Sequence, residues 1–110
     1  MNYQHKELAQ GKWSDLTFME QMANIGSEVE RATSWLKKKN AAYCRLAFDR
    51  ALELLDLTIA DKRNLLRLKE LARLREALAD YFLFDNVYGS SDKKWQNYFL
   101  AFNYAARLSA

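Results

Sequence analysis

The most apolar stretch of the chain runs from residue 40 to residue 60 and reads NAAYCRLAFDRALELLDLTIA. At about 100° per residue, its apolar side chains cover most of a helix circumference. They leave one narrow polar sector, formed by Arg45, Asp49, Glu53 and Asp56. A helix on a protein surface needs an apolar stripe of roughly 100°, and this stretch is apolar over about twice that angle. The pattern predicts a central helix with neighbours on at least two sides.

Three further predicted helices flank this one. Apolar faces with the period of a helix run over residues 15–38, 62–84 and 93–108. The four segments are preceded by residues that cap helix N-termini, namely Ser14, Asn40, Asp61 and either Ser91 or Asp92. Because the first two connections are short, consecutive helices should be antiparallel neighbours. We predict an all-α fold, an antiparallel up-and-down four-helix bundle over residues 14–110, preceded by an N-terminal arm over residues 1–13.

Gly26 lies on the apolar face of the first predicted helix, in the same stripe as Met22 and Val29. Glycine inside a helix costs about 1 kcal/mol relative to alanine, so its place in this stripe indicates a close helix contact. We expect Gly26 to mark the closest crossing between the first helix and either the second or the fourth.

The composition is that of one domain without a membrane span. The 110 residues are 50% hydrophobic, and the chain has no proline and three glycines, which fits a few long helices. No stretch of 18 apolar residues exists, and the N-terminus lacks the apolar run of a signal peptide. The single cysteine, Cys44, cannot form an internal disulfide. We therefore expect a cytoplasmic protein without membrane contact.

Groups needed for catalysis or for metal binding are scarce. His5 is the only histidine, which removes a histidine-based triad and a two-histidine metal site. The carboxylate pairs lack the Glu-x-x-His spacing of di-iron bundles, and no glycine-rich phosphate loop occurs. Free cysteine is usually a small buried hydrophobe, and we read Cys44 in that way. We predict no catalytic residue, no metal site and no cofactor.

Two arginines break the apolar pattern, Arg50 in the second predicted helix and Arg75 in the third. Each could form a structural ion pair with a carboxylate at a helix edge, such as Glu30, or extend its head group to the surface. Alternatively, the two could converge on a phosphate or an RNA backbone, or lie at a dimer interface. The segment 62–75 is the most basic of the chain, but its charges are spread around the helix. Solvated charge explains that segment without a nucleic acid.

The predicted bundle has more apolar surface than four helices need. Besides the nearly all-apolar second helix, the fourth helix has a stripe on its back, formed by Leu100, Tyr104 and Leu108, and Trp35 lies off the core face of the first. Such surplus usually marks a partner surface, and a homodimer is the simplest way to cover it. We predict a non-enzymatic interaction module. The alternative is weak RNA or nucleotide binding through Arg50 and Arg75.

The sequence resembles a family of small all-helical prokaryotic proteins without an assigned activity, over four strings that span roughly residues 14–108: FMEQMANIGSEVERA, FDRALELLDLTIAD, RLKELARLREALADYF and YFLAFNYAAR. The topology is also similar to HEPN domains, four-helix bundles that often dimerise and that accompany nucleotidyltransferases or act as RNases. RNase members carry an arginine, a short spacer and a histidine on a late helix, whereas the late helices here contain Arg75 and Arg107 without a histidine. The resemblance implies a binding or antitoxin-like partner protein rather than an RNase.

Overall fold

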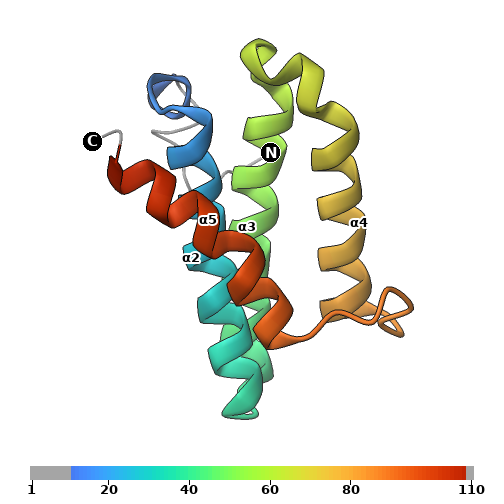
Figure 1. The fold of residues 1–110 in the computed structure, drawn as a ribbon. Helices are drawn as coiled ribbons and strands as arrows, with labels where there is room; N and C mark the ends of the chain where they lie inside the picture. Colours follow the sequence, from blue (N-terminus) through green and yellow to red (C-terminus); the bar gives the residue numbers. More distant parts are fainter. Residues whose placement is uncertain (1–10, 109–110) are drawn as a thin grey trace.

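A computed structural model describes residues 11–108 of the chain, which form four α-helices and two short 3-10 helices (Figure 1). In order they are η1 Lys12–Asp15, α2 Phe18–Lys37, α3 Ala41–Ala60, η2 Lys62–Arg67, α4 Leu68–Leu83 and α5 Asp92–Leu108. No strand occurs within the described residues. The all-α prediction is confirmed. Residues 1–10 of the predicted arm lie outside the described residues.

Helices α2 and α3 run antiparallel and pack along their lengths, and α4 returns beside α3 (Figure 1). The central helix therefore has a neighbour on two sides, as its broad apolar arc predicts. Helix α5 packs on α2 and crosses it obliquely, and it does not pack closely against α4. The fold is thus a group of four helices whose last member is tilted, and the expected regular up-and-down order is not confirmed for α5.

The first helix begins three residues later than the sequence analysis expects. Thr17 is its N-cap, because the Thr17 hydroxyl accepts from the backbone N–H of Glu20 at 3.1 Å and the Glu20 carboxylate accepts from the Thr17 N–H at 2.9 Å. Ser14 instead lies in η1 and donates to the carbonyl of Gly11 at 2.7 Å. The cap at Ser14 is therefore a wrong prediction. Thr17 has the Thr-x-x-Glu spacing of a capping box, and Ser14 lacks it.

The other predicted caps hold, but the third helix starts differently. Asn40 accepts from the N–H of Tyr43 and Asp61 accepts from that of Arg63, both at 3.0 Å. After Asp61 the chain forms the 3-10 helix η2, and α-helix resumes only at Leu68. Leu65, which belongs to the apolar face predicted over residues 62–84, is 66% exposed. Polar contacts of the buried Asn64, described below, hold this segment in place of apolar packing.

The core lies where α2, α3 and α4 face each other, and α5 covers it with Trp95 and Phe99. Gly26 is buried at the crossing of α2 and α5, where an added Cβ would lie 2.8 Å from the Cβ and Cγ of Phe99. Gly26 therefore marks the close crossing with the fourth predicted helix.

The connection before α5 is fixed by the buried Asp80, whose carboxylate accepts from the backbone N–H groups of Val87 at 2.9 Å and Tyr88 at 3.0 Å.

Candidate functional site

Arg75 forms an ion pair between helices. Its Nε lies 2.9 Å from Oδ1 of Asp56 on α3, and the hydrogen bond from Arg75 to that carboxylate raises the pKa of the guanidinium. Both side chains are about half-exposed, at 43% and 51%. Arg75 is therefore held in the structural ion pair that the sequence analysis considers, with Asp56 as partner in place of Glu30.

Arg50 is half-buried on α3. Three pockets are described below, and neither Arg50 nor Arg75 lines any of them. None of these three pockets can therefore be an anion site shared by the two arginines.

The cations of the basic segment 62–75 fall into two groups. Three are engaged with neighbours: Arg63 Nη2 lies 2.7 Å from Asp61 and 2.8 Å from the Leu16 carbonyl, Arg67 lies 4.1 Å above the ring of Phe18, and Arg75 pairs with Asp56. The other three, Lys62, Lys69 and Arg73, are exposed and form no ion pair with any residue of the range 11–108. Of the six cations in segment 62–75, these three side chains are therefore the ones available to bind a ligand.

Two of these free cations line a groove between α4 and α5, which has a volume of about 550 Å³. We call it the α4–α5 groove, and its lining residues are Leu66, Lys69, Glu70, Arg73, Leu74, Ala77, Trp95 and Tyr98. The Tyr98 hydroxyl donates to Glu70 Oε1 at 3.2 Å across the groove. Burial, followed by the nearby Glu70 carboxylate, raises the pKa of Tyr98 well above its usual range, so the hydroxyl stays a donor. The groove therefore combines apolar walls with charged and polar groups.

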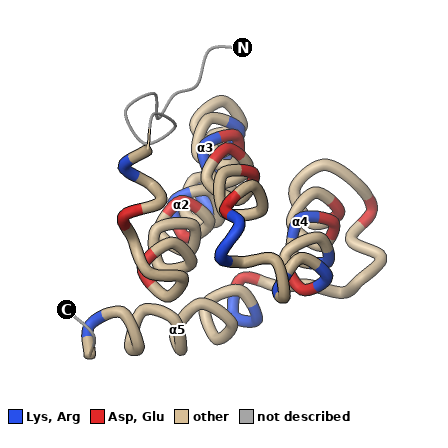
Figure 2. Tube along the Cα trace, turned by 90° about the horizontal axis from the view of Figure 1, so that it is seen from above, with Lys and Arg blue, Asp and Glu red and all other residues tan. Residues whose placement is uncertain are grey.

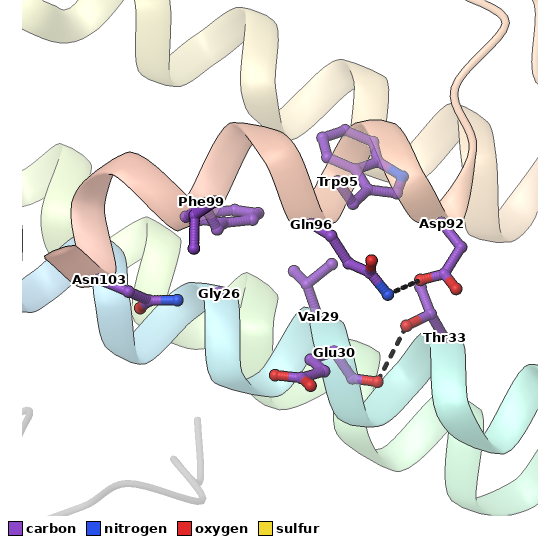
Figure 3. A pocket seen from close by; sticks show the side chains of 10 residues that line it. Gly26, Val29, Glu30, Thr33, Asp92, Trp95, Gln96, Phe99 and Asn103 are labelled. Atoms are coloured by element: carbon purple, nitrogen blue, oxygen red, sulfur yellow. Dashed lines mark hydrogen bonds between the residues drawn. The ribbon is translucent and has the colours of Figure 1, made fainter.

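A smaller pocket of about 190 Å³ lies where α5 crosses α2 (Figure 3). Val29, Phe99 and Trp95 line it together with polar residues, some of which bond to one another. Gln96 donates to Asp92 at 3.3 Å, the Thr33 hydroxyl donates to the Glu30 carbonyl at 2.9 Å, and Lys37 pairs with Asp92. Of these contacts, the ion pair between Lys37 and Asp92 joins α2 to α5. A third, open pocket of about 450 Å³ lies between α2 and the C-terminal half of α5.

The outer face of α5, which we define as Leu100, Tyr104 and Leu108, is open to solvent. These side chains are 63%, 64% and 71% exposed, and after Lys94 helix α5 has no charged residue until Arg107 (Figure 2). Trp35, the fourth predicted interface residue, belongs to a different surface. It packs edge-on against Tyr43 of α3 with ring centroids 4.8 Å apart, under the ammonium of Lys38.

A buried polar network ties η1, α2, α3 and η2 together, and the sequence analysis did not identify it. Gln21 donates to Asp61 at 3.0 Å and to the Trp13 carbonyl at 3.1 Å, while Asn64 donates to Gln21 Oε1 and to the Thr58 carbonyl at 3.0 Å. The Trp13 indole N–H completes the network by donating to the Thr58 hydroxyl at 3.1 Å. Gln21 stands beside Met22 on the apolar face of the first helix. A polar residue at that position was the feature of the sequence that could have indicated the network. Because the polar groups of the network are hydrogen-bonded to one another, we interpret the network as structural.

Within residues 11–108, no three His, Cys, Asp or Glu side chains are grouped so that they could hold a metal ion. In the same range no helix has the length and apolar character needed to cross a membrane. Comparison of the chain with protein-family models, curated proteins and solved structures finds no match. The similarity to HEPN domains therefore stays a prediction from the sequence.

Proposed function

We propose that this chain is a non-enzymatic interaction module of the cytoplasm, an up-and-down four-helix bundle with a tilted last helix, which binds a second copy of itself through the outer face of α5. One observation carries the proposal: Leu100, Tyr104 and Leu108 are each more than 60% exposed and lie on one side of a helix. Their spacing of four residues aligns them along the helix axis.

Burial of this face would provide a substantial driving force. Fully burying one large apolar side chain is worth about 1.5–3 kcal/mol. In a twofold dimer the same face is buried on both subunits, so each side chain contributes twice. A contiguous apolar patch on a soluble protein commonly marks such an interface.

The chemistry of the described residues supports binding rather than catalysis. Cys44 is buried, and desolvation raises the pKa of its thiol, which disfavours the nucleophilic thiolate. The buried carboxamides and hydroxyls of the Gln21 network form hydrogen bonds with groups of the network itself, so these bonds already occupy them.

Light scattering on paired variants tests the proposal. Leu100→Glu/Leu108→Glu should convert a dimer at micromolar concentration into a monomer, because carboxylates would be buried in the interface. Leu65→Glu/Val87→Glu changes two other exposed apolar residues by the same charge and should remain dimeric. A wild-type chain that is monomeric throughout, or a dimer that survives the α5 substitutions, would refute the proposal.

RNA or nucleotide binding, as in an antitoxin-like partner, is the second candidate function. The free cations Lys62, Lys69 and Arg73 favour it, whereas Arg75 is occupied by Asp56. Binding of labelled RNA should then weaken steeply with added salt, because phosphate contacts release counterions. An absence of binding at low salt would eliminate this candidate.

A further inference from the structure

The α4–α5 groove lies on the inner side of α5, away from the face assigned to the dimer. It exists because α5 packs on α2 and leaves α4 beside α3 without a close partner on this side (Figure 2). Leu74, Ala77 and the buried Trp95 give it an apolar wall. Its volume of about 550 Å³ falls in the range of small-molecule sites, about 300–1,000 Å³.

Lys69 and Arg73 supply positive charge along the same groove. They are four residues apart on α4, so they project from one face of the helix. Neither has an ion-pair partner in the described part of the chain, in contrast to Arg63 and Arg75 nearby. Their long aliphatic stems can lie on the apolar wall while the charged heads stay at the mouth.

Glu70 is the carboxylate of this groove, and it reduces the positive charge without cancelling it. Two cations and one carboxylate leave an excess of one positive charge. The Tyr98 hydroxyl already donates to Glu70 at 3.2 Å, which satisfies one carboxylate oxygen. An anion that approaches the mouth would therefore find Lys69 and Arg73 free to bind it.

Trp95 contributes a buried indole to the wall of this groove, and it also lines the pocket between α2 and α5. Trp95 is only 6% exposed, and its Nε1 has no hydrogen-bond acceptor among the described residues. A buried donor without an acceptor costs about 1–3 kcal/mol. A ligand in the groove would change the surroundings of this indole, so its N–H resonance reports on the site.

We propose that the α4–α5 groove binds an amphipathic anion, a small molecule with an apolar chain and one anionic head group such as a carboxylate. The chain would lie against Leu74, Ala77 and Trp95, and the head group would pair with Lys69 and Arg73. This site is independent of the proposed dimer, because it uses none of the residues of the outer α5 face. A free anion fits better than a membrane surface because the apolar wall lies in a groove between two helices and does not project from the molecule.

Titration with monomeric decanoate, followed by the indole N–H resonances in NMR spectra, tests the site. We expect saturable binding that shifts the Trp95 signal, which Trp95→Phe identifies. Decyltrimethylammonium, with the same chain and a positive head, should not bind. Vesicles of phosphatidylglycerol should not shift the signal either. Equal binding of the cationic surfactant, or a response to vesicles alone, would overturn the proposal.

Variants of exposed residues separate the charge requirement from folding. Lys69→Gln/Arg73→Gln should weaken decanoate binding by about tenfold or more, since charge-assisted contacts are lost. Lys62→Gln/Lys93→Gln removes the same net charge outside the groove and should leave the affinity within about twofold. Glu70→Gln should tighten binding. The proposal fails if both double variants lose affinity equally, or if Trp95 does not respond to decanoate in the wild type.

Discussion

Gly26 faces Phe99 across the crossing of α2 and α5, and this contact fixes how closely α5 approaches the core. An added Cβ would lie 2.8 Å from the Cβ and Cγ of Phe99, which are the least movable atoms of that side chain. The glycine in an otherwise apolar stripe is thus explained by packing. Its position could be read from the sequence, but the identity of the opposing residue could not.

The replacement Gly26→Ala should lower stability or leave it unchanged. Alanine gains about 1 kcal/mol of helix propensity, while overpacking costs about 1–3 kcal/mol, for a net loss of about 0–2 kcal/mol. Gly26→Leu should be far more destabilising. Denaturant unfolding measures both changes. In a Phe99→Ala background the loss caused by Gly26→Ala should shrink, because Cγ and the ring are removed while the contact with the Cβ of residue 99 remains. A full propensity gain in the wild-type background would contradict the packing account.

At the scale of elements, the start of α2 shows how a local rule decides between two plausible caps. Ser14 and Thr17 are both suitable N-cap residues, but only Thr17 has a glutamate three positions later. The reciprocal hydrogen bonds between Thr17 and Glu20 satisfy two backbone donors at the helix end. The Ser14 hydroxyl makes a single contact within the preceding turn.

Thr17→Ala should therefore destabilise the protein by about 1 kcal/mol, within a range of about 0.5–2 kcal/mol. Ser14→Ala is the matched control, since it removes a hydroxyl from the exposed turn just before and should have a much smaller effect. Thermal unfolding of the two variants gives the comparison. Equal losses of stability would mean that the helix N-terminus extends to Ser14.

For the whole molecule, the helix pattern was predictable and the tilt of α5 was not. Each amphipathic segment needs a partner, so periodicity located four helical segments, although α2 and α4 begin later than it predicts. The tilt depends on Gly26 meeting Phe99 and on Asp80 fixing the loop before α5, which are contacts between distant residues. The α4–α5 groove could not be predicted for the same reason, because it depends on how α5 is placed. Which cations of the basic segment stay free depends on where Asp56, Asp61 and Phe18 lie in space.

Acid should weaken the whole fold through Asp61, which joins the buried network to η2. Hydrogen bonds from Arg63 and then from Gln21 hold the pKa of Asp61 well below its ordinary value of 3.8. A lowered pKa in the folded state gives stability that is present above pH 3.8 and is lost as pH falls toward the folded-state pKa. Asp61→Asn should remove this part of the acid dependence. Unfolding measured from neutral pH down to strong acid would show a parallel decline in both proteins if Asp61 had no such role.

The claim that the outer face of α5 meets its own copy is tested most directly by a cysteine cross-link. Tyr104 lies between Leu100 and Leu108, so a twofold axis through the middle of this face would place position 104 opposite itself. In a Cys44→Ala background, Tyr104→Cys should form a disulfide-linked dimer rapidly under mild oxidation. Val87→Cys, exposed on the loop before α5, should remain monomeric in the same background. Equally slow cross-linking at the two positions would contradict the account.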